Sequence, residues 1–131
     1  MKKIIIVQSI PDALELVRKK IGATFPHLDS RVSYHGNFEK TLETIPKDEA
    51  IVVIASNGYH DEEDNLFDAN EKDGNRLAEE IKKINPQAKV YIFSIYKPRP
   101  EHIDGFYMKS QAGDNTVDEM INILIDLGLN V

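Results

Sequence analysis

Two short apolar runs constrain the fold of this chain more than any other feature. One run is Ile4, Ile5, Ile6 and Val7, and the other occupies residues 51–55, which read IVVIA. A strand with one side facing solvent alternates apolar and polar residues, but neither of these runs contains a polar residue. A strand that is apolar on both faces is typical of a parallel sheet covered by helices on both sides.

Helical spacing lies between the predicted strands. Leu14, Val17 and Ile21 recur every three to four residues, Pro11 suits the first turn of a helix, and Gly22 is expected to end it. Three further helices are predicted from apolar residues at the same spacing: Phe38, Leu42 and Ile45; Leu77, Ile81 and Ile84; and Val117, Met120, Ile121, Leu124 and Leu127.

Three more strands are predicted at residues 31–34, 90–93 and 106–108. Strands that alternate with helices indicate an α/β fold with a doubly wound parallel sheet and right-handed crossovers. Pro98 and Pro100 work against a full helix between the last two strands. The loops at the carboxyl ends of the strands are expected to form the functional site.

Composition narrows the class of protein. The chain has 131 residues, the size of a single domain covering residues 1–131. It has no cysteine, which fits a reducing cytoplasm, and a net charge of −6, which opposes binding to nucleic acid. No apolar run approaches the length of about twenty residues that spans a bilayer. We expect a soluble, cytoplasmic protein that binds neither nucleic acid nor membrane.

Several segments together resemble the receiver domains of bacterial response regulators. Residues 3–17 (KIIIVQSIPDALELV) resemble the first strand, turn and helix of that family. Residues 89–94 resemble its fourth strand, which ends in Ser or Thr, and residues 105–109 (GFYMK) its fifth, which ends in a lysine. The resemblance implies a five-stranded sheet of order 2-1-3-4-5 and a role in two-component signal transduction.

At the positions that match the family's phosphorylation site, however, this chain has no carboxylates. Receivers accept a phosphoryl group on an aspartate, beside a magnesium ion held by further carboxylates. Here Gln8 and Ser9 occupy the positions of the acidic pair, and either Ala55 or Ser56 occupies that of the phosphoacceptor. The sequence therefore predicts no catalytic residue, no metal site and no cofactor.

The rest of the family's pocket is present by resemblance. Ser94 matches the hydroxyl that contacts phosphate, Lys109 the cation that pairs with it, and Phe106 the aromatic switch. Ser110 replaces the proline that usually follows the lysine. A cis peptide at this bond therefore costs about 3 kcal/mol more than the trans form.

An acidic insert at about residues 57–73 departs from the usual short connection between strand and helix. The simplest interpretation is a solvated loop of like charges. Alternatively, Asp61, Asp64 or Asp68 folds over the pocket and replaces a missing carboxylate.

We expect a stand-alone pseudo-receiver that is not an enzyme and acts by binding a kinase, an output protein or itself. An atypical receiver phosphorylated on Asp61 or Asp64 is the alternative. A flavodoxin-like ligand binder is a third, although residues 8–12 contain no glycine for a phosphate loop. Ile123 and Ile125 widen the apolar face of the last helix and predict a possible homodimer through it.

Overall fold

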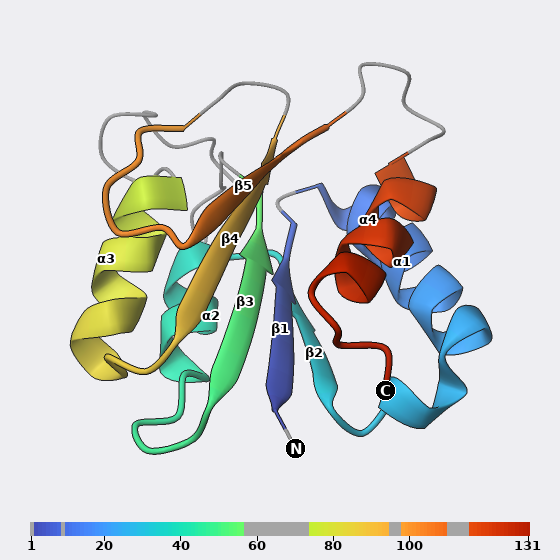
Figure 1. Ribbon diagram of the computed structural model, residues 1–131, viewed down its shortest axis with the longest axis horizontal. Coiled ribbons are helices and arrows are strands. Elements are labelled where there is room, and N and C mark those ends of the chain that lie inside the picture. The colour runs from blue at the N-terminus through green and yellow to red at the C-terminus, as the bar shows by residue number, and fades with distance from the viewer. Residues whose placement is uncertain (1, 9, 57–73, 95–97, 110–115) are drawn as a thin grey trace.

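The computed structural model describes residues 2–8, 10–56, 74–94, 98–109 and 116–131, and within these it has a five-stranded parallel sheet (Figure 1). The sheet order is β2-β1-β3-β4-β5. Its strands are β1 (Lys3–Val7), β2 (Val32–His35), β3 (Ile51–Ala55), β4 (Lys89–Ser94) and β5 (Gly105–Met108). The helices are α1 (Pro11–Thr24), the short 3-10 helix η1 (Pro26–Leu28), α2 (Phe38–Glu43), α3 (Gly74–Ile84) and α4 (Thr116–Asp126). The predicted fold class and strand order are confirmed.

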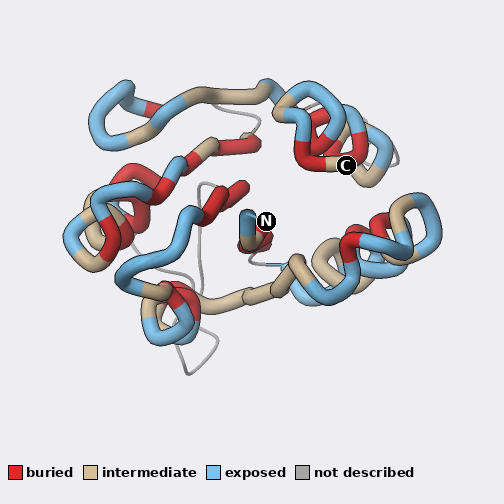
Figure 2. Tube along the Cα trace, turned by 60° about the horizontal axis from the view of Figure 1, so that its bottom comes forward, coloured by how far each residue is buried: buried red, intermediate tan, exposed pale blue. Residues whose placement is uncertain are grey.

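Helices cover both faces of the sheet, with α2 and α3 on one side and α1 and α4 on the other (Figure 1). Successive side chains of β1 point to opposite faces, so Ile5 and Val7 pack toward α2 and α3 while Ile4 and Ile6 pack toward α1 and α4. Buried positions accordingly gather on the three central strands β1, β3 and β4 and on the inner faces of the helices, whereas no residue of the edge strands β2 and β5 is buried (Figure 2). This double burial explains the unbroken apolar runs in the sequence.

Helix ends differ from the sequence predictions at two places. α1 continues past Gly22 to Thr24, because the buried Ile21 still accepts a hydrogen bond from the N–H of Phe25 (2.7 Å). The expected stop at Gly22 was therefore wrong. α2 ends at Glu43, before the predicted position Ile45, which lies beyond the helix but is still buried.

The last helix corrects the basis of the predicted dimer surface. Ile123 is 4% exposed and packs in the core between α1, α4 and the sheet, whereas Ile125 is 50% exposed. Helical residues two apart point about 200° away from each other, so these two cannot share one face. Ile123 therefore cannot contribute to a dimer surface.

The link between β4 and β5 contains no helix in its described part, residues 98–104, as the prolines predict.

A buried asparagine at the start of α3, Asn75, is hydrogen-bonded to the backbone of this link. The Nδ2 of Asn75 donates to the carbonyl oxygens of Arg99 (2.6 Å) and Glu101 (2.7 Å), and its Oδ1 accepts from the N–H of Arg99 (3.1 Å). His102 adopts a φ of 66°, which turns the chain toward β5.

A second buried asparagine does the same at the other end of α3. The Nδ2 of Asn85 donates to the carbonyl oxygens of Pro46 (2.9 Å) and Glu49 (2.8 Å), and its Oδ1 accepts from the N–H of Gln87 (3.0 Å). The two amides thus fix α3 to the loops on either side of it.

In the described part of the chain, no helix is both long and apolar enough to cross a membrane.

Candidate functional site

The carboxyl ends of the parallel strands meet at one edge of the sheet, where a doubly wound fold forms its site. Two backbone hydrogen bonds continue the ladder there. The N–H of Ser56 donates to the carbonyl oxygen of Val7 (3.0 Å), and the N–H of Lys109 donates to that of Ser94 (2.8 Å). The structure therefore brings the predicted residues of the third, fourth and fifth strands to the same edge.

Gln8 is fixed in the turn between β1 and α1. It is 5% exposed, and its N–H donates to the carbonyl oxygen of His35 (3.0 Å). Its side-chain Oε1 accepts from the N–H of Ile10 (3.3 Å), just before α1 begins. The amide oxygen thus already has a structural partner. Ser9 lies outside the described residues.

The two candidates for the phosphoacceptor position differ in environment. Ala55 is 1% exposed and belongs to the core against α2 and α3. Ser56, the next residue, is half-buried, and its hydroxyl oxygen is shielded from solvent. Both positions thus place little side-chain surface in water.

Lys109 directs its ammonium toward an aromatic ring. Its Nζ lies 5.8 Å from the ring centroid of Phe93, which is buried on the face covered by α1 and α4. A cation over an aromatic face gains about 0.5–1 kcal/mol at an exposed site. Phe106, the predicted switch residue, packs instead toward the α2 and α3 face. Phe93 and Phe106 thus lie on opposite sides of the sheet.

The acidic residues Asp61, Asp64 and Asp68 lie outside the described residues, as does Ser110. Among the residues that are described, no three His, Asp or Glu side chains gather closely enough to hold a metal ion. At the described carboxyl edge, the predicted site residues supply an amide, hydroxyls and an ammonium: Gln8, Ser56, Ser94 and Lys109. The imidazole of His35, at the end of β2, lies at the same edge.

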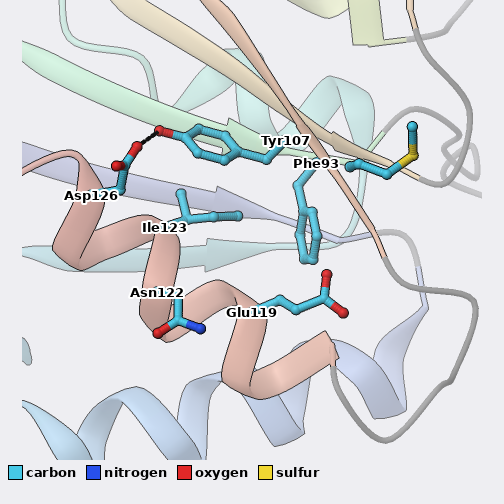
Figure 3. Close-up of a pocket in the computed structure, with 7 residues that line it drawn as sticks. Phe93, Tyr107, Glu119, Asn122, Ile123 and Asp126 are labelled. Carbon is cyan, nitrogen blue, oxygen red and sulfur yellow. Dashed lines mark hydrogen bonds between the residues drawn. The ribbon is translucent and has the colours of Figure 1, made fainter.

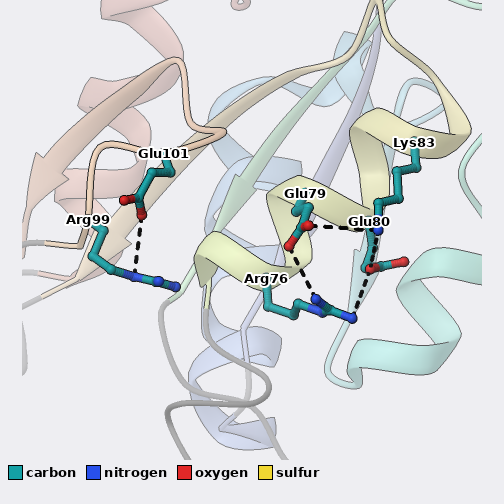
Figure 4. A network of polar contacts seen from close by, with 6 residues as sticks. All are labelled: Arg76, Glu79, Glu80, Lys83, Arg99 and Glu101. Carbon is teal, nitrogen blue, oxygen red and sulfur yellow. Dashed lines mark hydrogen bonds and ion pairs between the residues drawn. The ribbon is translucent and has the colours of Figure 1, made fainter.

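The charged outer face of α3 is a second place where polar groups cluster. Its ion pairs join residues three or four positions apart at 3.2–3.7 Å. Exposed pairs of this kind contribute at most about 1 kcal/mol, so this is a solvated helix face. Figure 4 shows these residues and a nearby pair: Arg76, Glu79, Glu80 and Lys83, with Arg99 and Glu101.

A groove of about 360 Å³ opens between the edge of the sheet and α4 (Figure 3). Residues of β4, β5 and α4 line it: Phe93, Tyr107, Met108, Glu119, Asn122, Ile123 and Asp126. The Tyr107 hydroxyl donates a short hydrogen bond to Oδ2 of Asp126 across the groove. Desolvation by burial, together with this carboxylate, raises the pKa of Tyr107 to about 12. The tyrosine therefore stays protonated and keeps the carboxylate in place at neutral pH.

Sequence reasoning missed this groove. The sequence patterns assign no role to Tyr107 or to the acids of the last helix. A signal was present, because Glu119, Asn122 and Asp126 recur at three and four residues and so share a helix face.

The sequence matches no protein-family model and no curated protein. Solved structures, in contrast, are similar over nearly the whole chain. The receiver domain of DrrB from Thermotoga maritima, activated by beryllium fluoride, has a TM-score of 0.60 and 17% identity, and 95% of this chain and 98% of that one are covered. The chain has the receiver fold. A receiver domain protein from Methanospirillum hungatei has a TM-score of 0.61 and 16% identity, with 96% and 95% covered.

A third similar structure is the N-terminal domain of an uncharacterized protein from Wolinella succinogenes. Its TM-score is 0.62 at 19% identity, with 96% of this chain and 93% of that one covered. At such identities the likeness is one of fold, and function has to be argued from the site. In this chain, the described part of the β4–β5 link contains no helix, and the side chain of Asn75 holds it in place.

Proposed function

We propose that this chain is a receiver-like signalling module that binds another protein and works without aspartyl phosphorylation. The observation that carries the proposal is the state of Gln8. Its position corresponds to the family's acidic pair, yet its amide is buried and bonded into the turn before α1. A neutral amide is a much weaker magnesium ligand than a carboxylate.

Two further observations support the proposal. An acid at position 55 would have to be buried in the core against α2 and α3, where a charged carboxylate is strongly disfavoured. The ammonium of Lys109 lies 5.8 Å from the ring centroid of Phe93, so it has a favourable contact in the absence of a phosphoryl group. The receiver framework thus remains useful as a rigid surface for a protein partner in the cytoplasm.

Titration with magnesium and beryllium fluoride, the phosphoryl mimic bound by the DrrB receiver domain, tests this proposal. We expect the amide NMR signals of Gln8, Ala55 and Lys109 to stay unchanged at millimolar concentrations of both. The DrrB receiver domain, which beryllium fluoride activates, serves as the positive control. Saturable shifts at these three residues would contradict the proposal and favour phosphorylation on Asp61 or Asp64.

A further inference from the structure

One residue of the β4–β5 link has a backbone conformation that side chains rarely adopt. His102 has a φ of 66°, and in the described part of the chain it is the only residue other than glycine with a positive φ. Its side chain is exposed, and among the described residues none bonds to the imidazole. The side chain therefore does not stabilise this conformation, which has to be maintained by neighbouring contacts.

Backbone contacts on both sides of His102 maintain its conformation. Before it, Asn75 of α3 holds the carbonyl oxygens of Arg99 and Glu101 at 2.6 and 2.7 Å. After it, Asp104 donates to and accepts from the backbone of β4 at 2.7 and 2.8 Å. The side chains of Arg99 and Glu101 are largely exposed and form only a solvated ion pair (Figure 4). The link is thus held through its backbone at two points, with the unfavourable φ between them.

The opposite end of α3 provides a matched comparison. Asn85 is buried like Asn75 and makes the same kinds of hydrogen bond. It donates to the carbonyl oxygens of Pro46 and Glu49 and accepts from the N–H of Gln87. Neither of the segments that it holds, residues 46–49 and 86–87, contains a positive φ. The same chemistry therefore holds both ends of α3, but the end at Asn75 holds a strained loop.

We propose that the β4–β5 link is a two-state latch. In the clamped state, described above, Asn75 holds the link and His102 stays at positive φ. In the released state, Asn75 loses these hydrogen bonds and His102 returns to an ordinary negative φ. The strain that is relieved offsets part of the hydrogen bonding that is lost, so the latch opens more readily than the whole chain unfolds.

Release of the latch changes the surface beside α3. Pro98 is buried, and Ile103 is partly buried against the core on the α2 and α3 side. Both residues gain exposure when the link leaves Asn75. A partner with higher affinity for the released link shifts the equilibrium toward it. The inference goes beyond the proposed function, because the latch lies outside the carboxyl-edge pocket and needs no phosphoryl group.

Native-state hydrogen exchange of the full chain tests this inference. The reporter is the amide of Arg99, which donates to Oδ1 of Asn75 (3.1 Å). The control is the amide of Gln87, which donates to Oδ1 of Asn85 (3.0 Å). We expect the equilibrium constant for opening to be at least about tenfold larger at Arg99 than at Gln87. It should not change at low urea concentrations, because local opening exposes little surface.

Three variants separate strain from flexibility. His102→Gly removes the strain and should lower the opening constant at Arg99 about threefold to tenfold. His102→Val adds strain, because a β-branched residue is disfavoured at positive φ, and should raise the constant at least about tenfold. Glu101→Gly, at a neighbouring residue without a positive φ, adds flexibility and should also raise it. All three should leave the opening constant at Gln87 unchanged.

Two results would overturn the inference. One is exchange at Arg99 that is no faster than exchange at Gln87, because the strained loop would then open no more readily than the unstrained one. The other is a change in the same direction for His102→Gly and His102→Val, which would show that the positive φ stores no strain. Neither result concerns phosphorylation, which the beryllium fluoride titration tests separately.

Discussion

Asp104 and Val90 are joined by two hydrogen bonds, one through the backbone and one through the carboxylate. The N–H of Asp104 donates to the carbonyl oxygen of Val90 (2.7 Å), and the N–H of Val90 donates to Oδ2 of Asp104 (2.8 Å). The same oxygen accepts from Nζ of Lys82 on α3 (2.8 Å). Asp104 therefore fixes the start of β5 against both β4 and α3, and so positions the strand that forms one wall of the groove.

Asp104→Asn should reduce the change in the free energy of unfolding between neutral and acidic pH. Partial burial raises the pKa of this carboxyl, but the hydrogen bonds from Lys82 and Val90 and the charge of Lys89 outweigh it and lower the pKa below its ordinary value. The contribution of a group with a lowered pKa is present above its unfolded value of about 4 and is lost as the pH falls through the folded value.

Urea unfolding at two pH values checks this prediction. At pH 7, Asp104→Asn should lower the free energy of unfolding by about 1 kcal/mol, and the difference should vanish near pH 2. Asp48→Asn, on an exposed loop, is the control and should change stability little at either pH. An equal loss for Asp104→Asn at both pH values would show that the carboxylate charge is not involved.

Asn75→Ala should destabilise the protein by about 2–4 kcal/mol, because it removes the hydrogen bonds that the Asn75 amide donates to the carbonyl oxygens of Arg99 and Glu101. Asn75→Asp should be at least as harmful, since it turns a carboxylate oxygen toward two carbonyl oxygens. Urea unfolding measures the loss, and amide exchange should accelerate first at Arg99, whose N–H bonds to Asn75. Normal protection at Arg99 would refute the role of this amide.

Gly105→Ala should be destabilising because of one close approach. A Cβ at position 105 would lie 2.8 Å from Cδ1 of Tyr91 and 3.0 Å from its Cε1. We expect a loss of about 1–3 kcal/mol, which should largely disappear in a Tyr91→Val background. Gly22→Ala is the matched control. It lies within α1 with nothing near its Cβ position, and should stabilise the protein by about 0.5–1 kcal/mol.

Ile123→Ala and Ile125→Ala should differ sharply although the residues are close in sequence. Ile123 fills the core, so its truncation should cost about 2–5 kcal/mol, while Ile125 is half-exposed and should cost less than about 1 kcal/mol. Thermal unfolding compares the two variants. Similar losses would mean that the position of α4 on the sheet is wrong.

The strands and their order were predictable because burial on both faces leaves a pattern that few other structures produce. Ile4 to Ile6 carry that pattern without a polar residue among them. Ile123 and Ile125 show where reasoning from composition fails, since two apolar residues on a helix were assigned to one face without regard to the angle between them.

The candidate site was less predictable, because side-chain direction depends on tertiary neighbours. The sequence placed Lys109 at the correct edge of the sheet, but the position of its ammonium depends on Phe93 of another strand. Asn75 and Asn85 resemble ordinary helix-end residues in the sequence. Their roles depend on carbonyl groups that lie 24 to 39 residues away along the chain.

Intact-mass spectrometry after incubation with acetyl phosphate and magnesium asks directly whether this chain, as we propose, works without aspartyl phosphorylation. The mass of the chain should not change under conditions that label an intact receiver domain. A phosphoryl adduct that hydroxylamine removes would refute the proposal, and fragmentation would then identify the carboxylate that carries it.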